Sequence, residues 1–423
     1  MTPGQTRQGA GFLSGRGVVT KMNPRRSGWN PLILLPLLWA MAFPFAGFPA
    51  YVSAANSPIW PLWDHFRQTF LQGDGRVIDR TDHDKTTSEG EAYTLFFSLV
   101  SGDRKSFRIV LSWIRNNLAQ GDLDRHLPAW LWGRRPDGKW GILDINSASD
   151  ADCWIAYSLI EAGRIWNRPD YASQGRRLLS LIEKNEVVFL EGYGWALLPG
   201  PWGFRLPGGM TRLNPSYLAP EILLRLTSVS HHNRWKEILE AALTHMNAIA
   251  PHGFVPDWFA VTRDGLVRPD PVTGPIGSYD AIRAYLWAGL LPSRNPVQKR
   301  LLAHMSNMFR DVERRFRAPL YANTVAGWTA GTGPAGFSAA LLPGLRAQGK
   351  TKAVSELRLL LSLACHKGLY GTPPAYYDQV LALFGTGFLD ARFSFDGNGN
   401  LTLPVAKGMT PAFHPNFPAC QSH

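Results

Sequence analysis

The stretch CWIAYSLIEAG, Cys153–Gly163, has apolar or small side chains at almost every position. A helix that is apolar on every side is enclosed by protein, whereas a helix with a single apolar stripe faces water on its other side. AYTLFFSLV at 92–100 and AIRAYLWAGLL at 281–291 have the same enclosed character. RKSFRIVLSWIRNNL at 104–118 and RWKEILEAALTHM at 234–246 lie between these stretches in the chain, and each has one charged face. This alternation predicts an inner ring of helices wrapped by an outer ring.

Periodic apolar segments continue along the chain, separated by turns rich in glycine, proline, asparagine and aspartate. They predict twelve helices, near 61–73, 88–101, 105–119, 149–166, 169–186, 214–228, 233–248, 278–291, 295–313, 334–347, 351–365 and 374–386. Six inner and six outer helices make an all-α toroid, an α/α barrel. The long segments 123–146 and 254–277 are expected to carry short β-hairpins and functional residues.

The two ends of the chain differ from this pattern. From Met22 a basic start, an apolar stretch and then small residues predict a secretory signal within 1–55, with 1–21 as an upstream extension. The alternative is a retained membrane anchor, which several prolines in the apolar stretch disfavour. The expected localisation is therefore periplasmic or secreted. A catalytic domain is expected over 56–392, followed by a peripheral proline-rich tail over 393–423.

Composition excludes several classes of function. Five of the basic residues behind the formal charge of +12 precede residue 28, and no cluster of Lys and Arg interleaved with aromatics follows, so nucleic acid is not an expected partner. The three cysteines form no C-x-x-C pair and H-E-x-x-H is absent, so no metal and no cofactor are predicted. GTGPAG at 331–336 matches a dinucleotide fingerprint, but a turn in which Pro334 opens a helix explains it better.

Acidic residues stand at the beginnings of three enclosed helices, each next to a serine that can cap the helix. The residues are Ser88 with Glu89 and, as a capping box, Glu91; Ser149 with Asp150 and Asp152; and Ser278 with Asp280. The helix dipole stabilises such an acid by about 0.3–1 kcal/mol, so each one alone can be a purely structural residue. Helices that share one direction would nevertheless bring the acids to one rim of the toroid.

Two carboxyl groups beside aromatic rings are what cleavage of a glycosidic bond requires, a protonated acid for the departing oxygen and a charged base for water. Glu89 is the expected acid, because burial and the charge of Asp150 raise the pKa of its carboxyl against the effect of the helix dipole. Asp150 is also expected to bind sugar hydroxyls. Asp280 is the expected base, and Arg283, one turn later, can pair with it.

Aromatic residues complete the expected site. Tyr217 in RLNPSYLAP is expected to hold the attacking water against Asp280, with an ordinary core tyrosine as the alternative. Trp130, Trp132, Trp140 and Trp258 fall in the long segments, where they can stack on sugar rings or pack in the core.

ASDADCWIAYSLIEAGRIW, 148–166, resembles the signature of glycoside hydrolase family 8. SEGEAY, NPSY and SYDAIR resemble other motifs of that family in the same order, and the similarity extends over about 58–392. LPAWLWG and GPAGFSAALLP are similar to members that are encoded with bacterial cellulose synthase, which are periplasmic endo-β-1,4-glucanases.

The resemblance implies an (α/α)6 barrel and hydrolysis of internal β-1,4 bonds of cellulose with inversion, which places the two carboxyls about 6.5–9.5 Å apart. It implies Glu89 as acid, Asp280 as base, Asp150 for substrate binding and distortion, and Tyr217 to orient water. The expected substrate-binding set is Tyr217, Trp130, Trp132, Arg283, Trp154 and Asn214.

The resemblance further implies a monomer that acts on a cellulose chain, with the cellulose synthase export machinery as a further partner. Two alternatives remain: a non-catalytic glucan-binding component of an export assembly, or a relative that acts on xylan, chitosan or mixed-linkage glucan.

Overall fold

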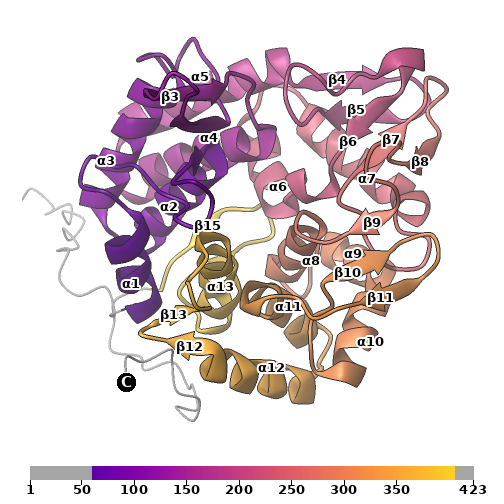
Figure 1. The fold of residues 1–423 in the computed structure, drawn as a ribbon. Helices are drawn as coiled ribbons and strands as arrows, with labels where there is room; N and C mark the ends of the chain where they lie inside the picture. The colour runs from indigo at the N-terminus through magenta and orange to yellow at the C-terminus, as the bar shows by residue number, and fades with distance from the viewer. Residues whose placement is uncertain (1–59, 405–423) are drawn as a thin grey trace, which may run out of the picture. The chain divides into compact units, whose positions relative to one another are not determined.

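The computed structural model describes residues 60–404, and the predicted signal region and the end of the predicted tail lie outside this range. Figure 1 shows one set of helices arranged around a centre and the others outside them. The inner helices are α2 (Ser88–Val100), α4 (Ser149–Ile165), α6 (Pro220–Val229), α8 (Ala281–Leu290), α11 (Ala335–Ala347) and α13 (Tyr376–Leu389). The outer helices are α1 (Pro61–Phe70), α3 (Arg104–Trp113), α5 (Pro169–Asn185), α7 (Arg234–Ile249), α9 (Pro296–His304), α10 (Ser306–Arg315) and α12 (Thr351–Ala364). The predicted α/α barrel is confirmed.

Three of the predicted helices differ in detail. The segment 295–313 is two helices, α9 and α10, which meet at Met305. The segment 214–228 begins with a separate 3-10 turn, Pro215–Tyr217, because the ring of Pro220 restricts the residue before it and opens α6 afresh. A π-helical turn, Ile114–Leu118, extends α3. None of the helices in the described range is both long and apolar enough to cross a membrane.

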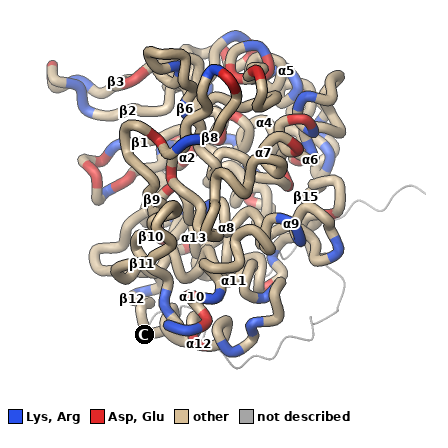
Figure 2. Tube along the Cα trace, turned by 90° about the vertical axis from the view of Figure 1, so that its right-hand side faces the viewer, with Lys and Arg blue, Asp and Glu red and all other residues tan. Residues whose placement is uncertain are grey.

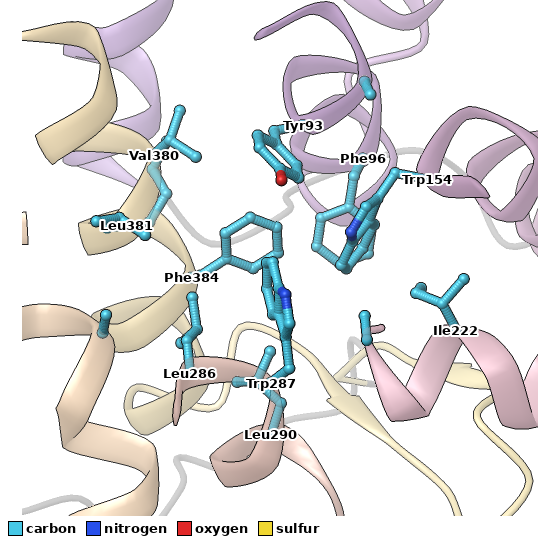
Figure 3. Packing of buried hydrophobic residues seen from close by; sticks show 14 of the residues in the cluster. Tyr93, Phe96, Trp154, Ile222, Leu286, Trp287, Leu290, Val380, Leu381 and Phe384 are labelled. Atoms are coloured by element: carbon cyan, nitrogen blue, oxygen red, sulfur yellow. The ribbon is translucent and has the colours of Figure 1, made fainter. Parts of the chain in front are cut away.

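Aromatic side chains fill the centre of the inner ring (Figure 3). Ring centroids lie 4.9 Å apart for Phe96 and Trp154, 5.3 Å for Trp154 and Trp287, and 5.0 Å for Trp287 and Phe384. Phe384 returns to Phe96 at 5.5 Å, so α2, α4, α8 and α13 meet on one aromatic cluster. Each of these buried rings contributes about 1.5–3 kcal/mol by leaving water.

Trp154 lies inside this cluster and is only 1 % exposed. The prediction that it binds substrate does not fit this position, because its ring is covered on the sides where a sugar would stack. The resemblance placed Trp154 within the signature, but the apolar pattern of α4 already described a side chain enclosed by neighbours.

Within residues 60–404 the chain forms six small antiparallel sheets, and three of them lead into the inner helices. These three are β1 (Thr86–Thr87), β2 (Leu131–Arg134) and β3 (Trp140–Asp144); β6 (Thr211–Leu213), β7 (Phe259–Val261) and β8 (Val267–Pro269); and β9 (Ile276–Gly277), β10 (Tyr321–Asn323) and β11 (Trp328–Ala330). Figure 2 shows β1, β2, β9, β10 and β11 on one side of the barrel and β15 on another. The hairpins predicted for 123–146 and 254–277 are confirmed.

The remaining sheets are two-stranded hairpins, β4 (Val187–Leu190) with β5 (Gly194–Leu197), β12 (Cys365–His366) with β13 (Leu369–Tyr370), and β14 (Ser394–Phe395) with β15 (Leu401–Thr402). The GTGPAG segment is a turn in which Gly331 has a φ of 70° and Pro334 precedes α11, as predicted. All sheets within 60–404 are antiparallel, so the fingerprint lacks the parallel βαβ unit that nucleotide binding requires.

The segment 393–404 is part of the core, so the prediction of a peripheral tail is wrong for these residues. Phe393, Phe395 and Leu401 are 1 %, 4 % and 2 % exposed. The hydroxyl of Tyr157 donates to the carbonyl of Gly399 over 2.9 Å, and the backbone N–H of Leu401 donates to Glu161 over 2.9 Å. The glycine- and asparagine-rich turn between β14 and β15 suggested a loop, but the strands beside it carry large apolar residues.

Candidate active site

Each predicted acid or tyrosine follows a strand of a small rim sheet. Glu89 is the second residue of α2, directly after β1, and Asp150 is the second residue of α4, after β3. Tyr217 ends the 3-10 turn that follows β6, and Asp280 lies immediately before α8, three residues after the end of β9. Three sheets therefore set the directions in which four side chains enter one rim of the barrel.

Arg283 connects these side chains. Its Nη2 donates to Asp280 Oδ1 over 2.9 Å and to Ser216 Oγ over 2.9 Å. The same nitrogen lies 3.6 Å from Asp150 Oδ2, and the guanidinium carbon lies 5.9 Å from the ring centroid of Tyr217. The arginine is buried, so its charge acts in a medium that screens weakly. Residues from α4, α8 and the 3-10 turn thus meet around one cation.

Glu89 is half-buried, and burial raises the pKa of its carboxyl. The negative charge of Asp280 raises this pKa further, while hydrogen bonding at the helix end, the charge of Arg283 and the hydroxyl of Ser88 oppose the rise. The Ser88 hydroxyl donates to Glu89 Oε2 over 3.4 Å. The net effect is a raised pKa, which is the direction that helps a general acid to keep its proton.

Asp150 is 2 % exposed, and burial raises the pKa of its carboxyl to about 7. Arg283 opposes this rise, whereas the charge of Glu89 adds to it. Oδ1 accepts the backbone N–H of Ala151 over 2.8 Å. Oδ2 is buried, has no hydrogen-bond partner among the described residues, and lies 3.6 Å from Arg283 Nη2.

The predicted capping box at α2 is wrong. Thr87, rather than Ser88, precedes the helix and accepts the backbone N–H of Gly90 over 3.2 Å. Glu91 Oε1 accepts the backbone N–H of Val77 over 2.8 Å instead of returning to the helix end. The serine is thereby left to contact Glu89.

The other two serines do not cap their helices either. Ser149 Oγ donates to the carbonyl of Leu198, and Ser278 Oγ donates to that of Leu320. Asp257, from the loop before β7, provides the missing acceptor at α8. Its Oδ1 accepts the backbone N–H groups of Ser278, Asp280 and Ala281 over 2.7, 3.0 and 2.7 Å. The sequence gave no signal for this residue, because it lies more than twenty positions from the helix it caps.

Two groups of aromatic residues flank the acids. Trp132 and Trp140 stack with centroids 5.4 Å apart, and Trp140 is 46 % exposed. The guanidinium of Arg76 lies 4.4 Å from the first ring and 4.6 Å from the second. Because β2 and β3 belong to the sheet of β1, this aromatic pair is attached to the strand that leads to Glu89.

On the other flank, Trp258 stacks on Phe204 with an interplanar angle of 5° and lies 6.2 Å from the ring of Tyr217. Arg212 lies 4.7 Å from the Trp258 ring centroid. Tyr279, next to Asp280, is 52 % exposed, and its carbonyl accepts the hydroxyl of Tyr377 over 2.7 Å. Sequence reasoning singled out neither tyrosine, although Tyr279 lies in the quoted SYDAIR motif.

Trp130 and Asn214 support the site from behind. Trp130 packs against the core, and its carbonyl accepts the backbone N–H of Ser88 over 2.9 Å. Asn214 is buried, and its Oδ1 accepts the backbone N–H and the hydroxyl of Ser216. Both residues hold segments that carry site residues. In the described range, no group of three or more His, Cys, Asp or Glu is placed to hold a metal ion.

Comparison with known proteins places the chain in one family. The sequence model of the glycosyl hydrolases of family 8 matches residues 38–391. An endoglucanase from Xanthomonas axonopodis pv. citri is 42 % identical over 367 residues, which cover 86 % of this chain and 94 % of that protein. An endoglucanase from Escherichia coli O157:H7 is 39 % identical over 381 residues, or 90 % of this chain and 97 % of that protein.

A solved structure agrees with these sequence relatives. The endo-1,4-D-glucanase from Vibrio fischeri ES114 superimposes with a TM-score of 0.73 at 39 % identity, covering 82 % of this chain and 99 % of that one.

Proposed function

The chain belongs to glycosyl hydrolase family 8, and on this basis we propose that it is an endo-β-1,4-glucanase that hydrolyses internal bonds of cellulose with inversion. The substrate is supported by relatives named as endoglucanases, which match this chain over nearly their whole length. It is also supported by the structural neighbour named as an endo-1,4-D-glucanase.

In this proposal Glu89 donates its proton to the glycosidic oxygen while Asp280 accepts a proton from the attacking water. Tyr217 orients that water, and Asp150 Oδ2, which has no hydrogen-bond partner within the described range, accepts a sugar hydroxyl. The observation that carries the proposal is the meeting of Asp280, Asp150 and Tyr217 around Arg283, beside a glutamate whose pKa is raised by burial. One acid that keeps its proton and one ion-paired carboxylate are the two groups that the reaction needs.

The test is release of reducing sugar from carboxymethyl cellulose by the wild type, Glu89→Gln and Asp280→Asn. Each substitution keeps the shape of its side chain and removes the proton transfer, so activity should fall by about 10²–10⁴-fold. Glu237→Gln on outer helix α7 is the matched control and should keep full activity. Equal thermal stability of the variants would show that folding is intact.

The alternative proposals predict different results. A non-catalytic glucan-binding component would bind the polymer in all variants and release sugar in none, including the wild type. Parallel assays on xylan, chitosan and mixed-linkage glucan would reveal a different substrate, since loss of activity in Glu89→Gln would then appear on that polymer instead.

We also propose that the enzyme acts on nascent cellulose in the periplasm, next to the export machinery, as a monomer. The basic start, apolar stretch and small residues within 22–55 support export. Mass spectrometry of the N-terminus of protein from the periplasmic fraction would test it. A mature chain that starts near residue 56 is expected, whereas an intact N-terminus in the membrane fraction would favour the anchor.

A further inference from the structure

Two acids that the mechanism does not use are buried behind Asp150. Asp152 lies on α4, and Glu186 lies between α5 and β4; both are 0 % exposed. Their carboxyl groups lie within hydrogen-bonding reach of each other. The hydroxyl of Ser147 donates to Glu186 Oε1 over 2.5 Å. No backbone N–H, lysine or arginine of the described range reaches the other oxygen of Glu186 or either oxygen of Asp152.

A contact between two carboxyl groups needs a proton, because two carboxylates both lack a donor. The groups that face the pair are Ser147 before α4, and Asp150 and Cys153 on α4. These are neutral or acidic, and two unpaired buried anions would cost several kcal/mol each. Burial accordingly raises the pKa of Asp152 well above its ordinary value and that of Glu186 to about 8, although the Ser147 hydroxyl opposes both shifts.

The pair lies on the opposite side of α4 from the site. Residues two apart on a helix point in different directions, so Asp150 faces Arg283 while Asp152 contacts Glu186. Ser149 Oγ donates to Leu198 O over 2.6 Å, and Leu198 N donates to Glu186 O over 2.8 Å. The first turn of α4 is therefore held from the front by the arginine and from behind by the segment of Glu186.

We propose that Asp152 and Glu186 share a single proton and act as a positioning pair that fixes Asp150 against Arg283 and Glu89. The pair then carries one negative charge near Asp150 rather than two. The kinetic effects expected of the Asp152–Glu186 pair rest on the proposed hydrolase function. The shared proton itself can be detected in the folded protein without any activity.

The first experiment measures the alkaline limb of kcat/KM in Asp152→Asn, Glu186→Gln and the double variant. Each single variant leaves one carboxylate and one amide, hence the same single charge that the shared-proton pair carries below about pH 8, so its kcat/KM should follow that of the wild type up to that pH. The double variant removes the charge, which lowers the pKa of Asp150 and Glu89 and moves the limb to lower pH by about one unit. Glu183→Gln, whose acid is bonded to Ser230 and Trp235, is the matched control.

The second experiment measures the melting temperature against pH and needs no substrate. Glu186 has a folded pKa above its unfolded value, so the folded state holds an extra proton, and stability is lost as pH rises from about 4.5 to about 8. Both single variants lack the second ionisation and should lose less stability across this window. Glu183→Gln should follow the wild type.

The third experiment separates positioning from general stability. Glu186→Ala removes the support behind α4, so kcat should fall by about ten-fold or more with KM little changed, because a displacement of a catalytic group costs rate. Glu186→Gln should restore kcat.

Three outcomes would overturn the proposal. A shift of the kcat/KM profile below about pH 8 in each single variant would show two separate charges in the wild type. Melting curves whose pH dependence is unchanged by the substitutions would exclude the shared proton. A Glu186→Ala variant with wild-type kcat would exclude positioning. An inactive wild type would refute the proposed hydrolase function. The melting experiment would still show whether Asp152 and Glu186 share a proton.

Discussion

At the scale of single residues, Asp150 has neighbours with opposing effects on its charge. The N-terminus of α4 and the guanidinium of Arg283 favour its ionised form, yet burial brings its pKa to about 7. Desolvation therefore exceeds the attraction of a cation 3.6 Å away. A group that titrates near neutrality beside the acid makes the reaction sensitive to pH.

Asp150→Asn tests this coupling. The charges of Asp150 and Glu89 each disfavour the other's ionised form, so removing one anion should lower the pKa of Glu89. The alkaline limb of kcat/KM should then move to lower pH, together with a fall in rate from the lost sugar contact. Measurement of kcat/KM on a soluble cellulose derivative from pH 5 to 9 checks this; an unmoved limb would mean that the two acids titrate independently.

Sequence reasoning identified Glu89, Asp150, Asp280, Arg283 and Tyr217, and the structure brings these residues together. Their roles in catalysis remain proposals. Motif likeness could name them because it depends on residue types at fixed spacing. It could not show that Trp154 is enclosed or that Asn214 holds a turn, because both facts depend on neighbours from other helices.

At the scale of secondary-structure elements, helix existence was easier to predict than helix ends. Apolar periodicity identified the inner and outer helices to within a few residues, because each helix carries buried apolar residues along its whole length. The caps failed at all three serines. Asp257 shows the reason, since its side chain comes from a distant loop and accepts three backbone N–H groups at α8. The spacing of residues near the start of α8 cannot predict this cap.

Asp257→Ala should therefore be more damaging than Ser278→Ala. The first leaves three N–H groups at the start of α8 without an acceptor and should lower the free energy of unfolding by about 2 kcal/mol or more. It should also lower kcat, because one of the three belongs to Asp280. Ser278→Ala removes one bond to a carbonyl and should cost about 1 kcal/mol. Urea unfolding of both variants checks the order; equal losses would refute the cap.

The division between α9 and α10 had no sequence signal. No proline or glycine stands near Met305, which is itself buried. A pattern of residue types therefore predicts a single helix for this segment.

At the scale of the whole described unit, the segment 393–404 completes the core that the helices build. Sequence reasoning excluded it because its strands are two residues long, too short for a periodic pattern. Its apolar side chains nevertheless contact α4 and α13, as the ring pairs of Phe395 with Tyr157 and of Phe393 with Phe384 show.

Phe395→Ala should therefore destabilise the protein by about 3–5 kcal/mol, the usual cost of deleting a buried phenylalanine. Phe189→Ala is the matched control, since Phe189 on β4 is 60 % exposed and should change stability by about 0.5 kcal/mol or less. Chemical denaturation compares the free energies of unfolding of the two variants. Similar small changes in both would show that 393–404 is not part of the core.

The aromatic cluster at the centre of the barrel has a consequence for the route of the polymer. The contacts among these rings fill the centre of the inner helices and leave no channel along the barrel axis. The rings are those of Phe96, Trp154, Trp287 and Phe384. A long glucan therefore cannot pass through the barrel. It must bind across the rim, with both ends of the polymer in solvent. Such a polymer can be bound at an internal position and released after one cleavage. The viscosity of a polymer solution should therefore fall well before soluble oligomers accumulate.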